Sequence, residues 1–193
     1  LTAVFSKILS VPCDDGLSYD LGTLSAKTIT KLDEYQGVNV SVTAFLGNIR
    51  ILVSIDIGFG DVIVPFRTKM RFPVLLDMDA PEIYGYSIES VLAEKIEAIV
   101  SLGGANTRYK DFYDIYVILK DKTVDRDNLR KALAETFSAR KTRFDDVVVF
   151  DSSFADDSER QRRWNAFIKN QNPNVLELPE WPTYNKETRL AMF

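Results

Sequence analysis

The sequence predicts an α+β fold, in which a mixed, largely antiparallel sheet precedes a helical C-terminal half. Two observations support this prediction. Apolar and polar residues alternate with a period of two over much of residues 14–86, which is typical of half-buried strands. From Ser87 onward, apolar residues recur at helical spacing instead. Because strands come first and helices follow, we expect two domains, residues 1–86 and residues 87–193.

The sheet half is predicted from alternation and from β-favouring composition. Its strands are expected at residues 17–21, 23–30, 38–45 and 49–57, with a brief continuation at 61–65. A tight connection joins 38–45 to 49–57 as an antiparallel hairpin, and the more apolar second strand is expected deeper in the sheet. Arg67, Lys69 and Arg71 then occupy alternate positions, as on one solvated face of a further strand.

Four helices are predicted in the second half, each beginning after a residue whose side chain can cap it. The first runs to about Leu102 and ends at two glycines, the second runs to about Lys120, the third to about Ser138, and the fourth contains Trp164 and Phe167. The expected capping residues are, in order, Ser87, Asn106 or Thr107, Asp127, and Asp156 or Asp157.

The composition excludes several kinds of chemistry within this chain. Its 193 residues have a net charge of only -4 and include no histidine, so no imidazole base or imidazole metal ligand is available. The single cysteine, Cys13, excludes an intrachain disulfide and a cysteine-cluster zinc site, which leaves hard cations held by carboxylates. No apolar run approaches the ~20 residues of a membrane span, and the lone thiol favours a cytoplasmic location.

Lys95 lies in the middle of the apolar stripe of the first predicted helix, whereas Glu94 and Glu97 are expected on the solvated side. Removing an unpaired cation from water costs ~several kcal/mol, so the position needs an explanation. Two interpretations remain open. The ammonium group either extends past the edge of the core into water, or it is partly buried and faces an anion such as a phosphate.

The second predicted helix has charges in a similar position. Asp111 falls inside its apolar arc, Asp114 lies at the edge of that arc, and Arg108 comes one turn earlier. Local pairs, Arg108 with Asp111 and Lys110 with Asp114, would each contribute only ~0.2 to 0.5 kcal/mol on a surface. Pairing of Lys95 with Asp111 or Asp114 would satisfy all of these charges together, so a structural ion cluster is the favoured interpretation.

Asp56 is a carboxylate in the middle of the apolar segment ILVSIDIGFGD. Alternation allows Ser54 and Asp56 to face solvent together on one side of the strand. Alternatively, Asp56 is a metal ligand on the surface of the sheet, where two-metal phosphoryl-transfer sites place their carboxylates.

Several ordered motifs resemble the AbiEii/AbiGii-type nucleotidyltransferase toxins, a family of the polymerase-β-like nucleotidyltransferase superfamily. The helical half contains AEKIEAIVSLGGANTRYKDFYDIYVIL and RQRRWNAFIKN, and the strand half contains YQGVNVSVTAFLGNIRILVSIDIGFGDVIVP. The resemblance spans most of the chain and implies a nucleotidyltransferase-like sheet. Many members of this family are toxins of type IV toxin–antitoxin, or abortive-infection, pairs.

The resemblance also implies roles for individual residues. Asp56 matches the third catalytic carboxylate of the family and would be a metal ligand. Lys95 matches the lysine of its Ala-Glu-Lys helix and would contact nucleotide phosphates. Asp114 would hold this lysine as part of the catalytic set. The nucleotide-binding residues implied are Lys95, Arg108, Lys110 and Asp111.

One family motif has no counterpart here. Members carry a glycine–serine turn, a helix and an Asp-x-Asp pair that holds two Mg²⁺ ions. Asp77-Met78-Asp79 has that spacing, but it lies between two prolines with no such turn before it, and we interpret it as a loop. We therefore expect that an N-terminal region is missing, and that this chain alone does not transfer nucleotides efficiently, because one carboxylate does not form a two-metal site.

In a complete protein, the implied reaction transfers a nucleotide from an NTP to an RNA or protein acceptor, with Mg²⁺ as cofactor. Residues 120–143 carry eight basic and four acidic side chains; they would suit an RNA such as tRNA, although a solvated helix face is the favoured interpretation.

The alternative function is a non-catalytic remnant or a binding module for an antitoxin, and we expect self-association if a sheet edge is exposed. In that alternative, an aromatic set would anchor the partner, although a core role is favoured for it: Phe150, Phe154, Trp164, Phe167 and Trp181.

Overall fold

A computed structural model describes residues 1–31, 35–121, 123–143 and 147–171 of the chain. Strands precede helices along the sequence, and the α+β prediction is confirmed. The chain forms two compact units, Leu1–Asp61 and Val62–Phe193. The strands near residues 68–85 therefore belong to the second unit, whereas the sequence places them with the N-terminal sheet.

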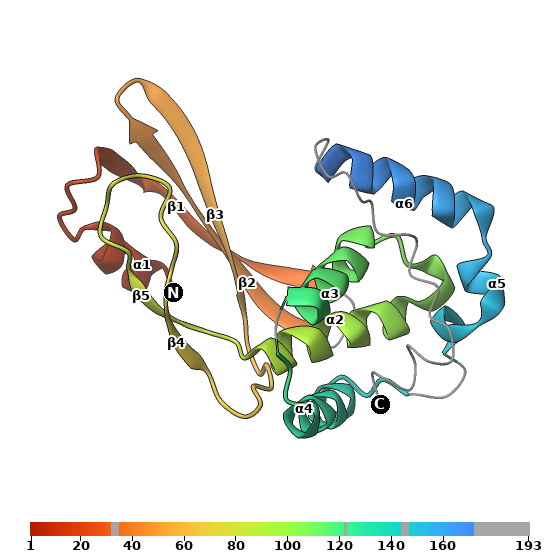
Figure 1. Ribbon diagram of the computed structural model, residues 1–193. Coiled ribbons are helices and arrows are strands. Elements are labelled where there is room, and N and C mark those ends of the chain that lie inside the picture. The colour runs from red at the N-terminus through yellow and green to blue at the C-terminus, as the bar shows by residue number, and fades with distance from the viewer. Residues whose placement is uncertain (32–34, 122, 144–146, 172–193) are drawn as a thin grey trace. The chain divides into compact units, whose positions relative to one another are not determined.

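The first unit contains a short helix and an antiparallel three-stranded sheet (Figure 1). Helix α1 (Thr2–Leu9) precedes strands β1 (Leu17–Lys31), β2 (Tyr35–Leu46) and β3 (Ile49–Gly58). The two stretches predicted at 17–21 and 23–30 form one strand, because the pairing of β1 with β2 only shifts register between Asp20 and Ser25. Gly47, with φ of 56°, forms the turn between β2 and β3, where an L side chain would be strained.

The order of the strands is β1-β2-β3, so β2 is central and β3 is an edge strand of the described sheet. The prediction that the more apolar strand of the hairpin lies deeper is wrong. Val40, Val42 and Ala44 of β2 are buried, whereas Ile51 and Ile55 of β3 are about two-fifths exposed. Apolar content indicates burial of a face, but the position of a strand in a sheet depends on which partners it pairs with.

The second unit begins with a two-stranded antiparallel ribbon, β4 (Thr68–Arg71) and β5 (Glu82–Gly85). Helices then follow in the order α2, α3, α4, α5 and α6, with two short 3₁₀ turns (Figure 1). Their bounds are Ile88–Leu102 for α2, Tyr109–Asp121 for α3, Arg126–Ala139 for α4, Ser152–Ala155 for α5 and Ser158–Gln171 for α6; the 3₁₀ turns are Gly103–Ala105 and Val148–Phe150.

The predicted caps are confirmed at the starts of α2 and α6. Helix α3 begins at Tyr109, so its N-cap position is Arg108 rather than the predicted Asn106 or Thr107. The Ser87 side chain accepts a hydrogen bond from the backbone N–H of Ser90 at the start of α2, and Asp157 accepts two at the start of α6. The prediction that Asp127 caps α4 is wrong, because Asp125 does so and Asp127 lies in the first turn. Both positions carry a capping residue type, so the pattern alone leaves the start uncertain by two residues.

The core of the second unit joins its helices through aromatic side chains. Trp164, Phe154 and Phe112 are almost fully buried, and Phe167 packs against them partly buried. The core interpretation of these aromatic residues is thus confirmed for Phe154, Trp164 and Phe167. The side chain of Phe150 and the whole of Trp181 lie outside the described residues.

None of the described helices is long and apolar enough to cross a membrane.

Candidate functional site

Lys95 of α2 meets two carboxylates of α3. Its Nζ atom lies 3.1 Å from Oδ1 of Asp111 and 2.6 Å from Oδ2 of Asp114. The lysine side chain is 19% exposed and that of Asp111 only 5%. The predicted pairing of Lys95 with these aspartates is confirmed, and it explains why a cation is tolerated on the apolar stripe of α2.

Two further cations, both on the solvent-exposed side, pair with the same two carboxylates. Arg108 Nε lies 2.8 Å from Oδ2 of Asp111, an ion pair without an aligned hydrogen bond, and Lys110 Nζ lies 2.8 Å from Oδ2 of Asp114. The side chains of Arg108 and Lys110 are 58% and 74% exposed. We call these five residues the α2–α3 ion cluster. Three cations face two carboxylates, so the cluster carries a net charge of +1.

The electrostatics of the cluster keep its central groups charged. Burial lowers the pKa of Lys95, but its hydrogen bonds to Asp114 and Asp111 outweigh this effect and raise that pKa above the ordinary lysine value. Burial raises the pKa of Asp114, but hydrogen bonds from Lys110 and Lys95 lower it below the ordinary aspartate value. A charged ammonium on Lys95 and an ionised carboxylate on Asp114 are therefore the stable states near neutral pH.

The loop between α2 and α3 is held from two sides, by Asn106, which the sequence offers as a capping residue, and by Arg160, which the sequence did not reveal. Asn106 is buried, and its Oδ1 accepts a hydrogen bond from the backbone N–H of Arg108. Arg160 of α6 donates to the carbonyl oxygens of Gly104 and Asn106 and stacks over the ring of Phe154 at 4.1 Å. These contacts set where α3 begins, and so which of its residues face Lys95.

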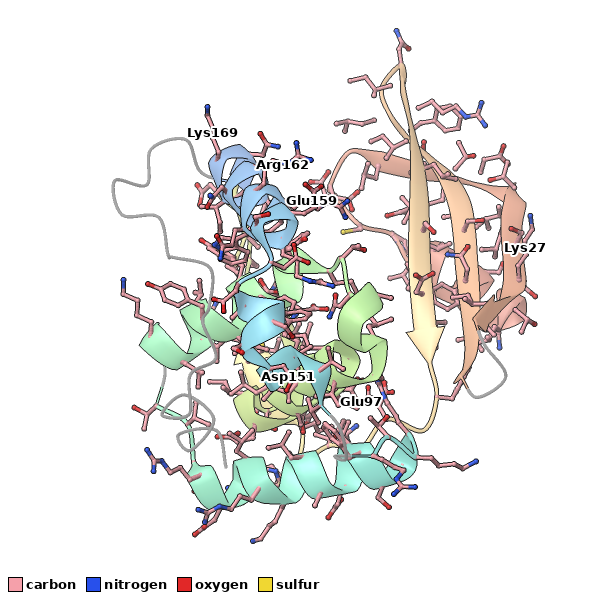
Figure 2. The ribbon with its side chains drawn as sticks, turned by 90° about the vertical axis from the view of Figure 1, so that its right-hand side faces the viewer. Lys27, Glu97, Asp151, Glu159, Arg162 and Lys169 are labelled. Atoms are coloured by element: carbon pink, nitrogen blue, oxygen red, sulfur yellow. The ribbon has the colours of Figure 1, made fainter. Side chains whose placement is uncertain are left out.

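The prediction that Glu97 lies on the solvated side of its helix is wrong. Its side chain is 3% exposed rather than solvated. Figure 2 labels Glu97 near the end of α4. Arg140, at the end of α4, lies 2.8 Å from Glu97 through Nη1 and also pairs with Glu94, while Thr142 donates a hydrogen bond to Glu97. The reason is that α4 packs against this side of α2, which a wheel of one helix does not show.

Asp56 belongs to the first unit, and we describe it within that unit. It is exposed on β3, opposite Asn39 of β2. Nδ2 of Asn39 lies 2.7 Å from both Oδ1 of Asp56 and Oγ of Ser54. The solvent-facing interpretation is thus confirmed, with Asp56 and Ser54 on the polar side of the sheet.

The described residues do not form a metal centre of the kind that two Mg²⁺ ions need. No group of three potential ligands from His, Cys, Asp and Glu is found among them. Asp56 is a single carboxylate with an amide and a hydroxyl beside it, whereas a two-metal site requires several carboxylates. Asp77 and Asp79 lie exposed in the loop between β4 and β5, as the sequence predicts for them. We therefore derive no chemical step through Mg²⁺.

Comparison with known proteins gives one match. A family model described as nucleotidyl transferase AbiEii toxin, type IV toxin–antitoxin system, matches residues 1–186. No curated protein and no solved structure matches the chain. The match includes both α2 and α3, with the whole of the ion cluster, and the strand that carries Asp56.

Proposed function

This chain belongs to the AbiEii family of nucleotidyl transferase toxins of type IV toxin–antitoxin systems, and from this premise we propose the reaction that it serves. In this proposal the full-length protein transfers a nucleotide from an NTP to an RNA or protein acceptor, and a cognate antitoxin opposes it. The observation that carries the proposal is the match over residues 1–186, in which the α2–α3 ion cluster lies.

The proposed role of the cluster is to bind the triphosphate. Arg108 and Lys110 are exposed enough to reach a phosphate that arrives from solvent, and Lys95 supplies a less exposed positive charge behind them. Asp111 and Asp114 carry negative charge and would repel a phosphate, so we assign them the task of holding the three cations in place. Their contacts of 2.6–3.1 Å to those cations support this division of roles.

In the proposed transfer, the oxygen of an acceptor hydroxyl forms a bond to the α-phosphorus of the NTP, and its proton passes to water. The bond between the α-phosphorus and the bridging oxygen to the β-phosphate breaks, and pyrophosphate leaves with the electron pair of that bond. Negative charge grows on the departing phosphates, and cations already fixed in position stabilise it without reorganisation. Lys95, Arg108 and Lys110 would act in this way.

Asp56 is the proposed catalytic carboxylate of the sheet. In the full-length protein, we expect Asp56→Ala to lower the transfer of label from an α-³²P-labelled NTP by about tenfold or more, which corresponds to about 1.4 kcal/mol in activation free energy. Reactions are run with Mg²⁺ and, in parallel, with a chelator. Asp77→Ala, at another exposed aspartate, is the matched control and should label as the unaltered protein does. Equal labelling by Asp56→Ala and the unaltered protein would remove Asp56 from the catalytic set.

The alternative function, a binding module for an antitoxin, has less support from the structure. Phe154 and Trp164, two of the five side chains considered as its anchors, are 4% and 0% exposed in the core of the second unit. A surface anchor must be accessible before binding.

Self-association through the edge of the sheet is a further expectation of this proposal. In the described sheet β3 pairs on one side only, and antiparallel pairing of two copies about Val53 would set Ile51 of one copy opposite Ile55 of the other. We expect the molecular mass measured by light scattering to rise with protein concentration. Leu52→Lys on β3 should abolish this rise, whereas Leu76→Lys, at an equally exposed leucine outside the sheet, should not. A monomer at every concentration would contradict the expectation.

A further inference from the structure

The first turn of α3 is held by α6 in two ways. Trp164 of α6 packs against Tyr109, the first residue of α3, with ring centroids 6.5 Å apart. One turn before Trp164, Arg160 reaches the loop that precedes α3, where Nη1 donates to the carbonyl oxygen of Asn106 at 3.1 Å and Nη2 donates to that of Gly104. The apolar contact and the two hydrogen bonds act on neighbouring residues, so α6 fixes this loop as well as the helix that follows it.

Arg160 is itself fixed within the second unit. Its side chain is 16% exposed, its Nε lies 3.4 Å from Oδ2 of Asp157, and its guanidinium carbon lies 4.1 Å from the centre of the Phe154 ring. The carboxylate and the aromatic ring restrict the orientation of the guanidinium, and this orientation presents both Nη groups to the loop. Arg162 on the same helix differs, because its side chain is 76% exposed and pairs with Glu159.

Asn106 links this anchor to the α2–α3 ion cluster. The residue is 2% exposed, and its side-chain Oδ1 accepts a hydrogen bond from the backbone N–H of Arg108 at 2.7 Å. Its Nδ2 group is buried and has no acceptor among the residues that the structure describes. Burying a donor without an acceptor is costly, so this side chain is better explained by what Oδ1 does for Arg108 than by a contribution to stability.

Arg108 is consequently fixed at both ends. Asn106 holds its backbone N–H, and Asp111 lies 2.8 Å from its Nε. The side chain is nevertheless 58% exposed, so a ligand arriving from solvent can reach the guanidinium. An exposed arginine ordinarily samples several rotamers and loses that freedom when a ligand binds, which weakens binding. An arginine that is ordered beforehand avoids much of this loss.

We propose that Arg160 and Asn106 are positioning residues of the triphosphate site, which hold Arg108 ready for a phosphate without touching the phosphate themselves. The inference rests on the proposed function, in which Arg108 binds the triphosphate, and it extends the site to α6. The hydrogen bonds of Arg160 end on backbone carbonyls, and Asn106 is buried, so neither side chain serves as a phosphate ligand. When either is removed, Arg108 stays in the protein but has to be ordered as the ligand binds, and the affinity falls.

Asn106→Ala separates positioning from stability. It removes the acceptor for Arg108 together with the buried Nδ2 donor, and these two changes have opposite effects on stability. The melting temperature should therefore stay within about 3 °C of that of the unaltered protein. The affinity for inorganic tripolyphosphate, measured by titration calorimetry on the folded full-length protein without NTP, should fall about 3- to 10-fold. A purely structural role would leave the affinity of the folded protein unchanged.

Arg160→Met tests the anchor on α6. It keeps an apolar stem but removes the donors to the loop, so it should also lower the affinity about 3- to 10-fold. Arg162→Ala removes an exposed arginine from the same helix and is the matched control, which should bind as the unaltered protein does. Each titration is run well below the melting temperature of the variant. If Arg160→Met does not fold, Asn106→Ala decides the test alone.

A double-mutant cycle tests whether the effect passes through Arg108. Arg108→Ala should itself lower the affinity about tenfold or more, because a charge-assisted contact to phosphate is lost. Adding Asn106→Ala to this variant should cause a further loss of less than about twofold. Combined with Lys110→Ala instead, Asn106→Ala should keep its full effect, because Lys110 is held by Asp114 on α3 rather than by the loop.

Three results would overturn the inference: no binding of tripolyphosphate by the unaltered protein, unchanged affinity in either variant when it is folded, or a loss from Asn106→Ala that is as large without Arg108 as with it. Failure of the proposed function is a separate result. The expected affinities without transfer of label from an α-³²P-labelled NTP would keep the positioned triphosphate site and remove the transferase. Transfer with an unchanged KM for NTP in both variants would keep the transferase and remove the inference.

Discussion

Lys95→Met is expected to lower the free energy of unfolding by about 3 kcal/mol. The substitution keeps an apolar stem of similar length but leaves Asp111, whose side chain is 5% exposed, with Arg108 as its partner. Removing one member of a buried ion pair typically costs about 3–5 kcal/mol, because the remaining charge is uncompensated. We expect a cost at the lower end of this range, because the Lys95 side chain is itself 19% exposed and Arg108 still pairs with Asp111 in the variant. Urea denaturation followed by fluorescence measures the change.

Lys110→Met is the matched control for this prediction. Lys110 pairs with Asp114, as Lys95 does, but its side chain is 74% exposed. An exposed ion pair contributes about 1 kcal/mol or less, so this variant should remain close to the unaltered protein. If Lys95→Met lowered the free energy of unfolding no more than Lys110→Met does, burial would not be what makes the pair of Lys95 and Asp111 important for stability.

A repair experiment separates a structural role of Lys95 from a role in binding the triphosphate. Adding Asp111→Asn to Lys95→Met removes the uncompensated charge, and the double variant should recover about 1–3 kcal/mol of stability. If Lys95 only holds α2 against α3, nucleotide transfer should recover with stability. If Lys95 contacts phosphate, as we propose, stability should recover while labelling stays low. The structural role and the phosphate-binding role of Lys95 therefore differ in a measurable way.

The helix pair could be predicted from the sequence because the informative patterns are local. Helical spacing places Lys95 within one apolar stripe, and Asp111 and Asp114 within or beside the next. Burial of unpaired charge is costly enough that opposite charges on neighbouring helices have few alternatives to pairing with each other. The confirmed contacts show that this physical argument, without any knowledge of the packing, was sufficient for these three residues.

The features that escaped prediction depend on partners distant in the sequence. Glu97 has the periodicity of a solvated residue, and only the packing of α4 brings Arg140 to it, 43 residues later. The contacts of Arg160 to the loop before α3 span 54 and 56 residues. Likewise, β3 has the composition of an inner strand, but its pairing makes it an edge of the described sheet. Periodicity within one element carries no information about which other element covers it.

Trp164→Ala is expected to have the largest effect on stability, about 3–5 kcal/mol. Trp164 is fully buried, with ring centroids 6.5 Å from Tyr109 and 5.9 Å from Phe167. Truncation removes the contacts of the indole and leaves a cavity where α6 meets the start of α3. Because the core around α6 is closely packed, the helix cannot move far enough to fill this cavity. Thermal or urea unfolding of the second unit gives the measurement.

Arg163→Ala on the same helix controls for general effects on α6. Arg163 is 54% exposed and pairs with Glu159, so its loss should cost less than about 1 kcal/mol. The comparison also decides between a core and an interface role for Trp164. A core residue changes unfolding of the isolated protein in the absence of any partner. If Trp164→Ala unfolded like the unaltered protein and lost only the binding of an antitoxin, the side chain would be an interface anchor, and the alternative function as a binding module would regain its support.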